Sequence, residues 1–93
     1  MLVMVEEVLF ESEQSSTRGE IADYLRSVAE RLAQGESITL KAGSQELSMD
    51  PPERATFEVK AEREGPPDGP GELSIEFEIE WDENGNGGDL EVA

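Results

Sequence analysis

The sequence predicts an α+β fold in which a single amphipathic helix packs on one face of a mainly antiparallel sheet, in the order β-α-β-β-β-β. Leu73–Trp81 alternates strictly between apolar odd positions and Ser or Glu at even positions, which is typical of a half-buried strand. Residues 17–34 carry one apolar stripe at helical spacing. Short polar connections join the later strand-like stretches, which favours antiparallel pairing. We expect one domain over residues 5–83 and a flexible acidic Gly/Asn tail over residues 84–93.

The first strand is expected at Val5–Glu13, although Leu9 falls on its polar side and makes the alternation imperfect. The apolar residues Met1–Val5 should lead into this strand. They are too few for a signal peptide or a membrane span, and no basic segment precedes the apolar run.

The helix is expected at residues 17–34. Thr17 is a good N-cap residue, and Glu20, three positions later, completes a capping box. Gly35 should end the helix in the left-handed conformation that glycine adopts readily. The stripe that faces the sheet consists of Ile21, Tyr24, Leu25, Val28 and Leu32.

Four further strands are expected to form two hairpins. Ser37–Ala42 and Gln45–Asp50 flank a Gly43-Ser44 turn, and Pro51-Pro52 stops the second of them because proline lacks the ladder donor. Ala55–Glu64 and Leu73–Trp81 flank the turn-forming loop Gly65–Gly71. The apolar faces of helix and strands are expected to share one small core.

Charge is the strongest compositional signal, with 23 acidic against 7 basic residues and a net charge of −16. Such a charge is typical either of disorder or of a folded protein adapted to concentrated salt. The regular strand and helix periodicities favour the folded, halophilic interpretation. The negative surface argues against direct binding to nucleic acid or to an anionic membrane. With the halophilic interpretation, we expect a protein of the cytoplasm.

Composition also limits the chemistry. The chain has no Cys and no His, which removes thiolate chemistry, the commonest general base and the commonest metal ligand. Carboxylates on an open sheet face are expected to be solvated, with ordinary pKa values. We therefore expect no enzymatic activity and no cofactor.

Asp82–Gly87 matches the first half of a calcium-binding loop, with Asp82, Asn84, Asn86 and Gly87 at the required spacing. The position of the bidentate glutamate is Ala93, and no helix is expected on either side. A tail without a metal site is the favoured interpretation.

The candidate site is the outer face of the last two strands. If these strands pair around Gly65–Gly71, Lys60 lies opposite Glu76, and Glu58 lies opposite Glu78 as an unfavourable like-charge pair. This face is either a solvated halophilic surface or a docking site. Trp81 is a candidate aromatic anchor, although its register places it on the inward side. The candidate acidic interaction face consists of Glu58, Glu62, Glu76, Glu78 and Glu80.

Four stretches together resemble the amphi-Trp domain family: Leu9-Phe10-Glu11, Thr17–Leu25, Pro51-Pro52-Glu53 and Leu73–Glu83. The resemblance covers roughly residues 7–83, and Glu80-Trp81-Asp82-Glu83 is its most specific part. It implies the fold and a bacterial or archaeal, often halophilic, setting. The family has no established activity, so the resemblance supplies no catalytic residues, and residues 85–93 depart from its pattern.

The sequence thus predicts a non-enzymatic binding or interaction module with a halophilic acidic surface. Its partner would be an unknown protein, either a second copy of the chain or a basic protein. The alternative is a weak carboxylate-mediated binder of divalent cations.

Overall fold

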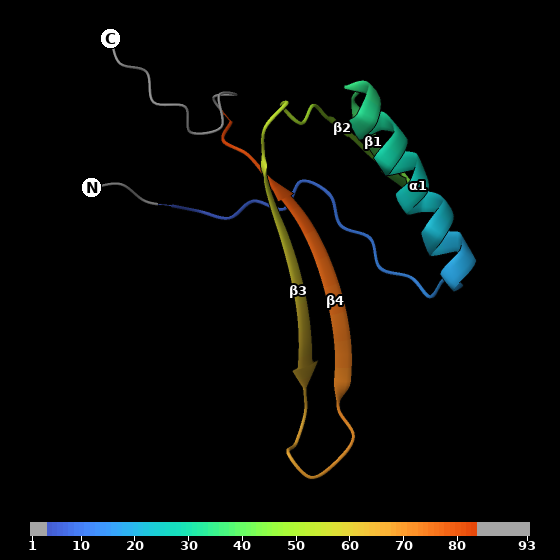
Figure 1. Cartoon of the computed structure of the whole chain (residues 1–93), viewed down its shortest axis with the longest axis vertical. Coiled ribbons are helices and arrows are strands. Elements are labelled where there is room, and N and C mark those ends of the chain that lie inside the picture. The colour runs from blue at the N-terminus through green and yellow to red at the C-terminus, as the bar shows by residue number, and fades with distance from the viewer. Residues whose placement is uncertain (1–3, 84–93) are drawn as a thin grey trace. The chain divides into compact units, whose positions relative to one another are not determined.

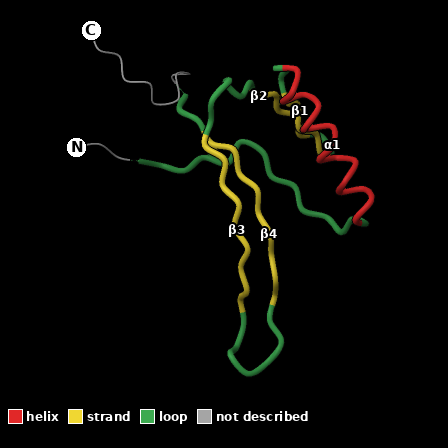
Figure 2. The backbone as a smooth tube through the Cα atoms, viewed as in Figure 1, coloured by secondary structure: helices red, strands yellow, loops and turns green. Residues whose placement is uncertain are grey.

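The computed structural model describes residues 4–83 and forms one helix and four strands (Figure 1). The strands pair into two antiparallel two-stranded sheets, β1–β2 and β3–β4 (Figure 2). The predicted α+β class and the antiparallel pairing are therefore confirmed. The chain divides into two compact units, Met1–Pro51 and Pro52–Ala93. The elements are α1 (Arg18–Gln34), β1 (Ile38–Ala42), β2 (Gln45–Met49), β3 (Thr56–Glu64) and β4 (Glu72–Glu80).

Two details of the predicted sheet are corrected. The strand expected at Val5–Glu13 does not form, since residues 4–16 adopt neither helix nor strand. An antiparallel ladder needs a partner strand, and the hydrogen bond from this segment to β2 is made by a side chain: Gln45 Nε2 donates to the Glu11 carbonyl over 3.1 Å. In addition, the single sheet expected from the sequence is two separate ladders. The tail predicted for residues 84–93 lies outside the described residues.

Helix α1 begins and ends as predicted. The Glu20 backbone N–H donates to Thr17 Oγ1 (3.1 Å), and the Thr17 N–H donates to Glu20 Oε1 (2.9 Å), which completes the capping box. Gly35 adopts φ 69° and ψ 27°, and the Glu36 N–H returns to the Arg31 carbonyl at 2.9 Å. Local sequence alone therefore determines both ends of this helix.

Hairpin β1–β2 pairs Leu40 with Leu47 and Ile38 with Met49, and these four side chains are half-buried on one face. Helix α1 contacts β1, which matches the predicted packing of the helix against a sheet. On the polar face, the Thr39 and Ser48 hydroxyls lie 2.7 Å apart and share a hydrogen bond.

The core predicted from the apolar faces is only partly enclosed. None of the described residues is fully buried, and the exposed fractions of Ile21, Tyr24, Leu25 and Leu32 in α1 lie between 40% and 52%. One helix on a two-stranded ladder has too little surface to enclose its own apolar stripe.

Hairpin β3–β4 is nine residues long on each strand and is closed by a tightly built loop. The Arg63 guanidinium donates to the carbonyls of Pro66 (2.9 Å) and Gly69 (2.6 Å). Gly65 has φ 152°, and a Cβ on it would lie 2.6 Å from the Cα of Gly71. The backbone thus comes so close at the loop entrance that both positions require glycine.

We predict that Gly19→Ala stabilises the chain. Gly19 lies in the first turn of α1, and an added Cβ would meet only Thr17 Oγ1, at an ordinary 3.9 Å. Alanine loses less backbone entropy on folding, so the free energy of unfolding should rise by about 0.5–1 kcal/mol. Urea unfolding in molar KCl measures it. Gly35→Ala is the control and should destabilise because of its positive φ; a destabilising Gly19→Ala would contradict the prediction.

Candidate interaction surface on the β3–β4 hairpin

The register of β3–β4 brings the five predicted glutamates onto one face. Glu58 pairs with Glu78 and Lys60 with Glu76, as expected from the sequence. Glu62 lies opposite Ser74, and Glu80 lies opposite Thr56. Since successive side chains alternate between faces, the even-numbered residues of both strands share one surface. We call this surface, made of the even-numbered residues 56–64 and 72–80, the acidic face.

The acidic face contains two carboxylates that the sequence interpretation left out. Glu64 lies opposite Glu72 at the loop end, as a second directly opposed like-charge pair. The register that places Glu58 opposite Glu78 also places these two residues opposite each other, so this pair could have been predicted from the sequence. Both pairs oppose folding of the hairpin in dilute salt.

The only cation on the acidic face is Lys60. Its Nζ lies 4.0 Å from Glu62 Oε2, and the two side chains are 52% and 56% exposed. Glu76, its partner across the ladder, is not the carboxylate that it contacts. An exposed pair at this distance contributes little, so the acidic face stays strongly negative.

The carboxyl of Glu78 departs from the ordinary pKa values expected for this face. Hydrogen bonding to the Glu58 side chain is the largest cause that raises the pKa of Glu78, followed by the negative charge of Glu80. Removal from solvent and the charges of Glu58 and Glu76 act in the same direction. Crowding of carboxylates, rather than a cavity, thus changes this titration.

A pH dependence follows from this shift. Because its pKa is raised above the ordinary 4.5, folded Glu78 binds a proton more readily than unfolded Glu78 does. The contribution of Glu78 to stability should therefore improve as pH falls from neutrality through the raised pKa. We predict that Glu78→Gln raises the Tm at pH 7 in dilute salt and flattens the dependence of Tm on pH between 7 and 4.5.

Thermal unfolding followed by circular dichroism over this pH range measures the effect. Glu62→Gln is the matched control because Glu62 faces Ser74 rather than another carboxylate. It should give no gain in Tm. Equal gains from the two variants would show that net charge alone, rather than the opposed pair, is responsible.

The opposite face of the hairpin is apolar and open. Five of its large side chains are exposed, with fractions that run from 57% for Val59 to 78% for Leu73, whereas Ile79 is half-buried. The Phe57 and Phe77 rings stack in parallel, with centroids 6.3 Å apart. We call this surface the apolar face; its residues are Phe57, Val59, Ala61, Leu73, Ile75, Phe77 and Ile79.

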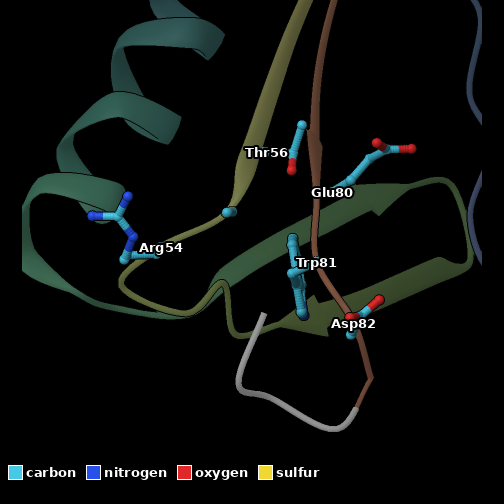
Figure 3. Close-up of a pocket in the computed structure, with 6 residues that line it drawn as sticks. Arg54, Thr56, Glu80, Trp81 and Asp82 are labelled. Atoms are coloured by element: carbon cyan, nitrogen blue, oxygen red, sulfur yellow. The ribbon is translucent and has the colours of Figure 1, made fainter. Parts of the chain in front are cut away.

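Trp81 follows the end of β4 and is half-buried, so it is neither a fully buried core residue nor a fully exposed anchor. It lines an open hollow of about 450 Å³ with Arg54, Thr56, Glu80 and Asp82 (Figure 3). In Figure 3 the Glu80 and Trp81 side chains leave the strand in different directions, as the alternation requires. The hollow is mostly polar and lies at the open end of the hairpin.

A second hollow, of about 650 Å³, lies within the unit that contains α1. It is lined by the segment Phe10–Ser16, by the first turns of α1 and by Lys41–Gly43. The Glu20 carboxylate on this wall accepts the Thr17 N–H in the capping box, so it serves the helix. No pattern in the sequence predicted this hollow, because it depends on an irregular segment.

Within residues 4–83, no group of three or more Asp or Glu side chains is placed to hold a metal ion. The possible calcium loop at Asp82–Gly87 extends into residues 84–87, which lie outside the described range. No helix in the described part of the chain is both long and apolar enough to cross a membrane.

A known protein family matches the chain. The model of the Amphi-Trp domain family matches residues 4–93. No curated protein and no solved structure matches the chain. The family match includes α1, both hairpins and the Trp81 region, which carry the resemblance noted in the sequence. The expectation that residues 85–93 depart from the family's pattern was wrong, since the match extends to residue 93. Because the match covers nearly the whole sequence, the chain belongs to the Amphi-Trp domain family.

Proposed function

We propose that the chain is a non-enzymatic interaction module that works in the concentrated salt of a halophilic cytoplasm. One observation carries the proposal: hairpin β3–β4 exposes a row of large apolar side chains on one face and carboxylates on the other. Contiguous exposed apolar patches mark interaction surfaces in water-soluble proteins. In this proposal the apolar face supplies the binding energy. The acidic face makes stability and binding depend on the salt concentration.

The charge supports the halophilic part of the proposal. A net charge of −16 on 93 residues is strongly self-repelling in dilute salt and is largely screened at molar salt, where the Debye length is about 3 Å. A partner that docks on the acidic face would need to be basic. A partner that docks on the apolar face needs a complementary apolar surface instead.

Enzymatic activity is not proposed, because acid–base catalysis needs a carboxyl that is positioned in a concave, desolvated site. Glu78, whose pKa is raised, lies on an open sheet face. Divalent-cation binding remains the alternative. Titration with Ca²⁺ at constant ionic strength tests it, and site-specific NMR shifts at Asp82–Asn86 or at Glu58–Glu80 would favour it.

Affinity capture from a lysate in molar KCl tests the proposal. Ile75→Glu puts a charge on the apolar face, whereas Ser74→Glu adds the same charge to the acidic face one residue away. The wild-type chain and Ser74→Glu should capture the same protein, and Ile75→Glu should not. Capture that survives Ile75→Glu, or that yields no protein with the wild-type chain, would overturn the proposal.

A further inference from the structure

The apolar face of β3–β4 requires a cover. An isolated two-stranded hairpin is at best marginally stable in water, and it needs further strands or a helix against its apolar face. Here five large side chains lie on that face, with exposed fractions between 57% and 78%; they are Phe57, Val59, Leu73, Ile75 and Phe77.

We propose that a second copy of this chain provides the cover, so that two β3–β4 hairpins pack face to face with their loops at opposite ends. This inference rests on the proposed function, in that both treat the apolar face as an interaction surface. It goes further because it names the partner and its orientation.

The apolar face is self-complementary in shape along β3. A two-fold axis can run parallel to the sheet, along the line that joins the paired residues Val59 and Phe77. Rotation about this axis stacks β3 on β3 and β4 on β4 of the second copy. Phe57 then lies over the small Ala61 of the second copy, and Ala61 lies under the second copy's Phe57. Large side chains that meet small ones across an interface allow the two layers to interdigitate. On β4 the same axis places Phe77 over the second copy's Phe77, so these two rings pack against each other.

The charges at the two ends of the apolar face favour loops at opposite ends. Arg63 lies at the loop end of this face, opposite Leu73, whereas Arg54, Trp81 and Asp82 lie at the open end. With the loops at opposite ends, each Arg63 approaches the open end of the second copy, where the Asp82 carboxylate and the Trp81 ring offset the charge of Arg54. With the loops at the same end, the two Arg63 guanidinium groups would meet instead, which is unfavourable.

The position of the carboxylates agrees with this arrangement. The acidic faces of both copies point outward, away from the interface, because the faces alternate along each strand. Packed sheets lie about 10 Å apart, so the two acidic faces are separated by more than the ~3 Å Debye length at molar salt. Two chains of net charge −16 can therefore associate in concentrated salt and should separate in dilute salt.

The area is sufficient for a specific but weak dimer. Five apolar side chains that each bury about 100 Å² give about 500 Å² per copy, or about 1,000 Å² in total. This is near the lower limit for a specific interface. The dimer should accordingly depend on protein concentration as well as on salt.

Sedimentation equilibrium of the purified chain in molar KCl provides the first test. The average mass should rise from monomer to dimer with protein concentration, and the dimer should dissociate in dilute salt. Ile75→Glu should weaken the dimer by more than about 100-fold, because it buries a carboxylate in each copy. Ser74→Glu, the matched control, should leave the dissociation constant in molar KCl within a few-fold of wild type.

The wild-type result is decisive even if Ile75→Glu fails to fold. A chain that remains a monomer at every concentration and salt level would overturn the inference, since another segment of the same chain would then cover the face. If this monomer still captures a protein through Ile75, the proposed function stands and only the second copy is ruled out. If Ile75→Glu affects neither mass nor capture, both proposals fall.

The orientation is tested by a distance between spin labels. The chain has no native Cys, so Asp68→Cys in the exposed loop carries a single nitroxide per copy. At about 3.4 Å per residue, loops at opposite ends place the two labels roughly 50 Å apart. Labels within about 20 Å of each other would show that the loops lie at the same end and would overturn the proposed orientation.

Discussion

Transfer from molar KCl to about 0.1 M salt is expected to destabilise hairpin β3–β4 strongly, since the Debye length grows from about 3 to about 10 Å. The acidic face has directly opposed carboxylates at Glu58–Glu78 and at Glu64–Glu72, and Lys60 is its only cation. At molar salt these repulsions are screened, whereas in dilute salt they act across the whole face. Stability should therefore fall progressively with KCl concentration.

Thermal unfolding at a series of KCl concentrations, followed by circular dichroism, measures this loss. A variant that combines Glu78→Gln with Glu64→Gln removes one carboxylate from each opposed pair. Its Tm should be higher than that of the wild-type chain in dilute salt, and the difference should shrink in molar KCl. Wild-type stability that does not depend on KCl would contradict the halophilic account.

The second large effect is expected at the loop entrance of the same hairpin, where Gly65→Ala should destabilise by about 2–4 kcal/mol. The new Cβ would lie 2.6 Å from the Cα of Gly71, and the φ of 152° is unfavourable for alanine. Backbone atoms cannot move aside as a flexible side chain can, so the end of the ladder between Glu64 and Glu72 should open.

Urea unfolding in molar KCl measures this change, and Gly69→Ala is its control in the same loop. A Cβ on Gly69 would meet only the Pro66 side chain, at 3.3 Å, so a smaller loss is expected. Equal losses for the two variants would show that the close approach of Gly65 and Gly71 does not matter. Amide exchange at Arg63 and Glu64 would localise the opening.

Features that depend on neighbouring residues were predictable from the sequence. The Thr17–Glu20 capping box and Gly35 define α1, because each acts within one turn of the chain. The register of β3–β4 follows from its alternation and from the loop Gly65–Gly71, and this is why the pairing of Glu58 with Glu78 could be predicted.

Features that depend on distant parts of the chain were not predictable. Val5–Glu13 has strand-like residues, yet whether it pairs depends on a partner that its own pattern does not specify. The separation of the strands into two ladders was not predictable for the same reason, because a strand's own pattern does not specify its partner. The shared core expected from the apolar faces likewise required knowledge of which faces meet.

The candidate site was predictable to a similar extent. Alternation alone groups the five glutamates on one face, but it does not show how crowding changes the titration of Glu78. The two hydrogen bonds by which Arg63 holds the loop depend on the loop's backbone path. The alternation of Leu73–Trp81 also predicted a buried face. Leu73, Ile75 and Phe77 on that face are exposed, whereas Ile79 and Trp81 are half-buried.

Amide hydrogen exchange along β3–β4 tests the central claim that contacts through the apolar face hold this hairpin together. In molar KCl, Ser74→Glu should keep the protection of the wild-type ladder, and Ile75→Glu should lose it across both strands. The two variants carry the same added charge at neighbouring positions on opposite faces. Equal protection in both variants would contradict the account.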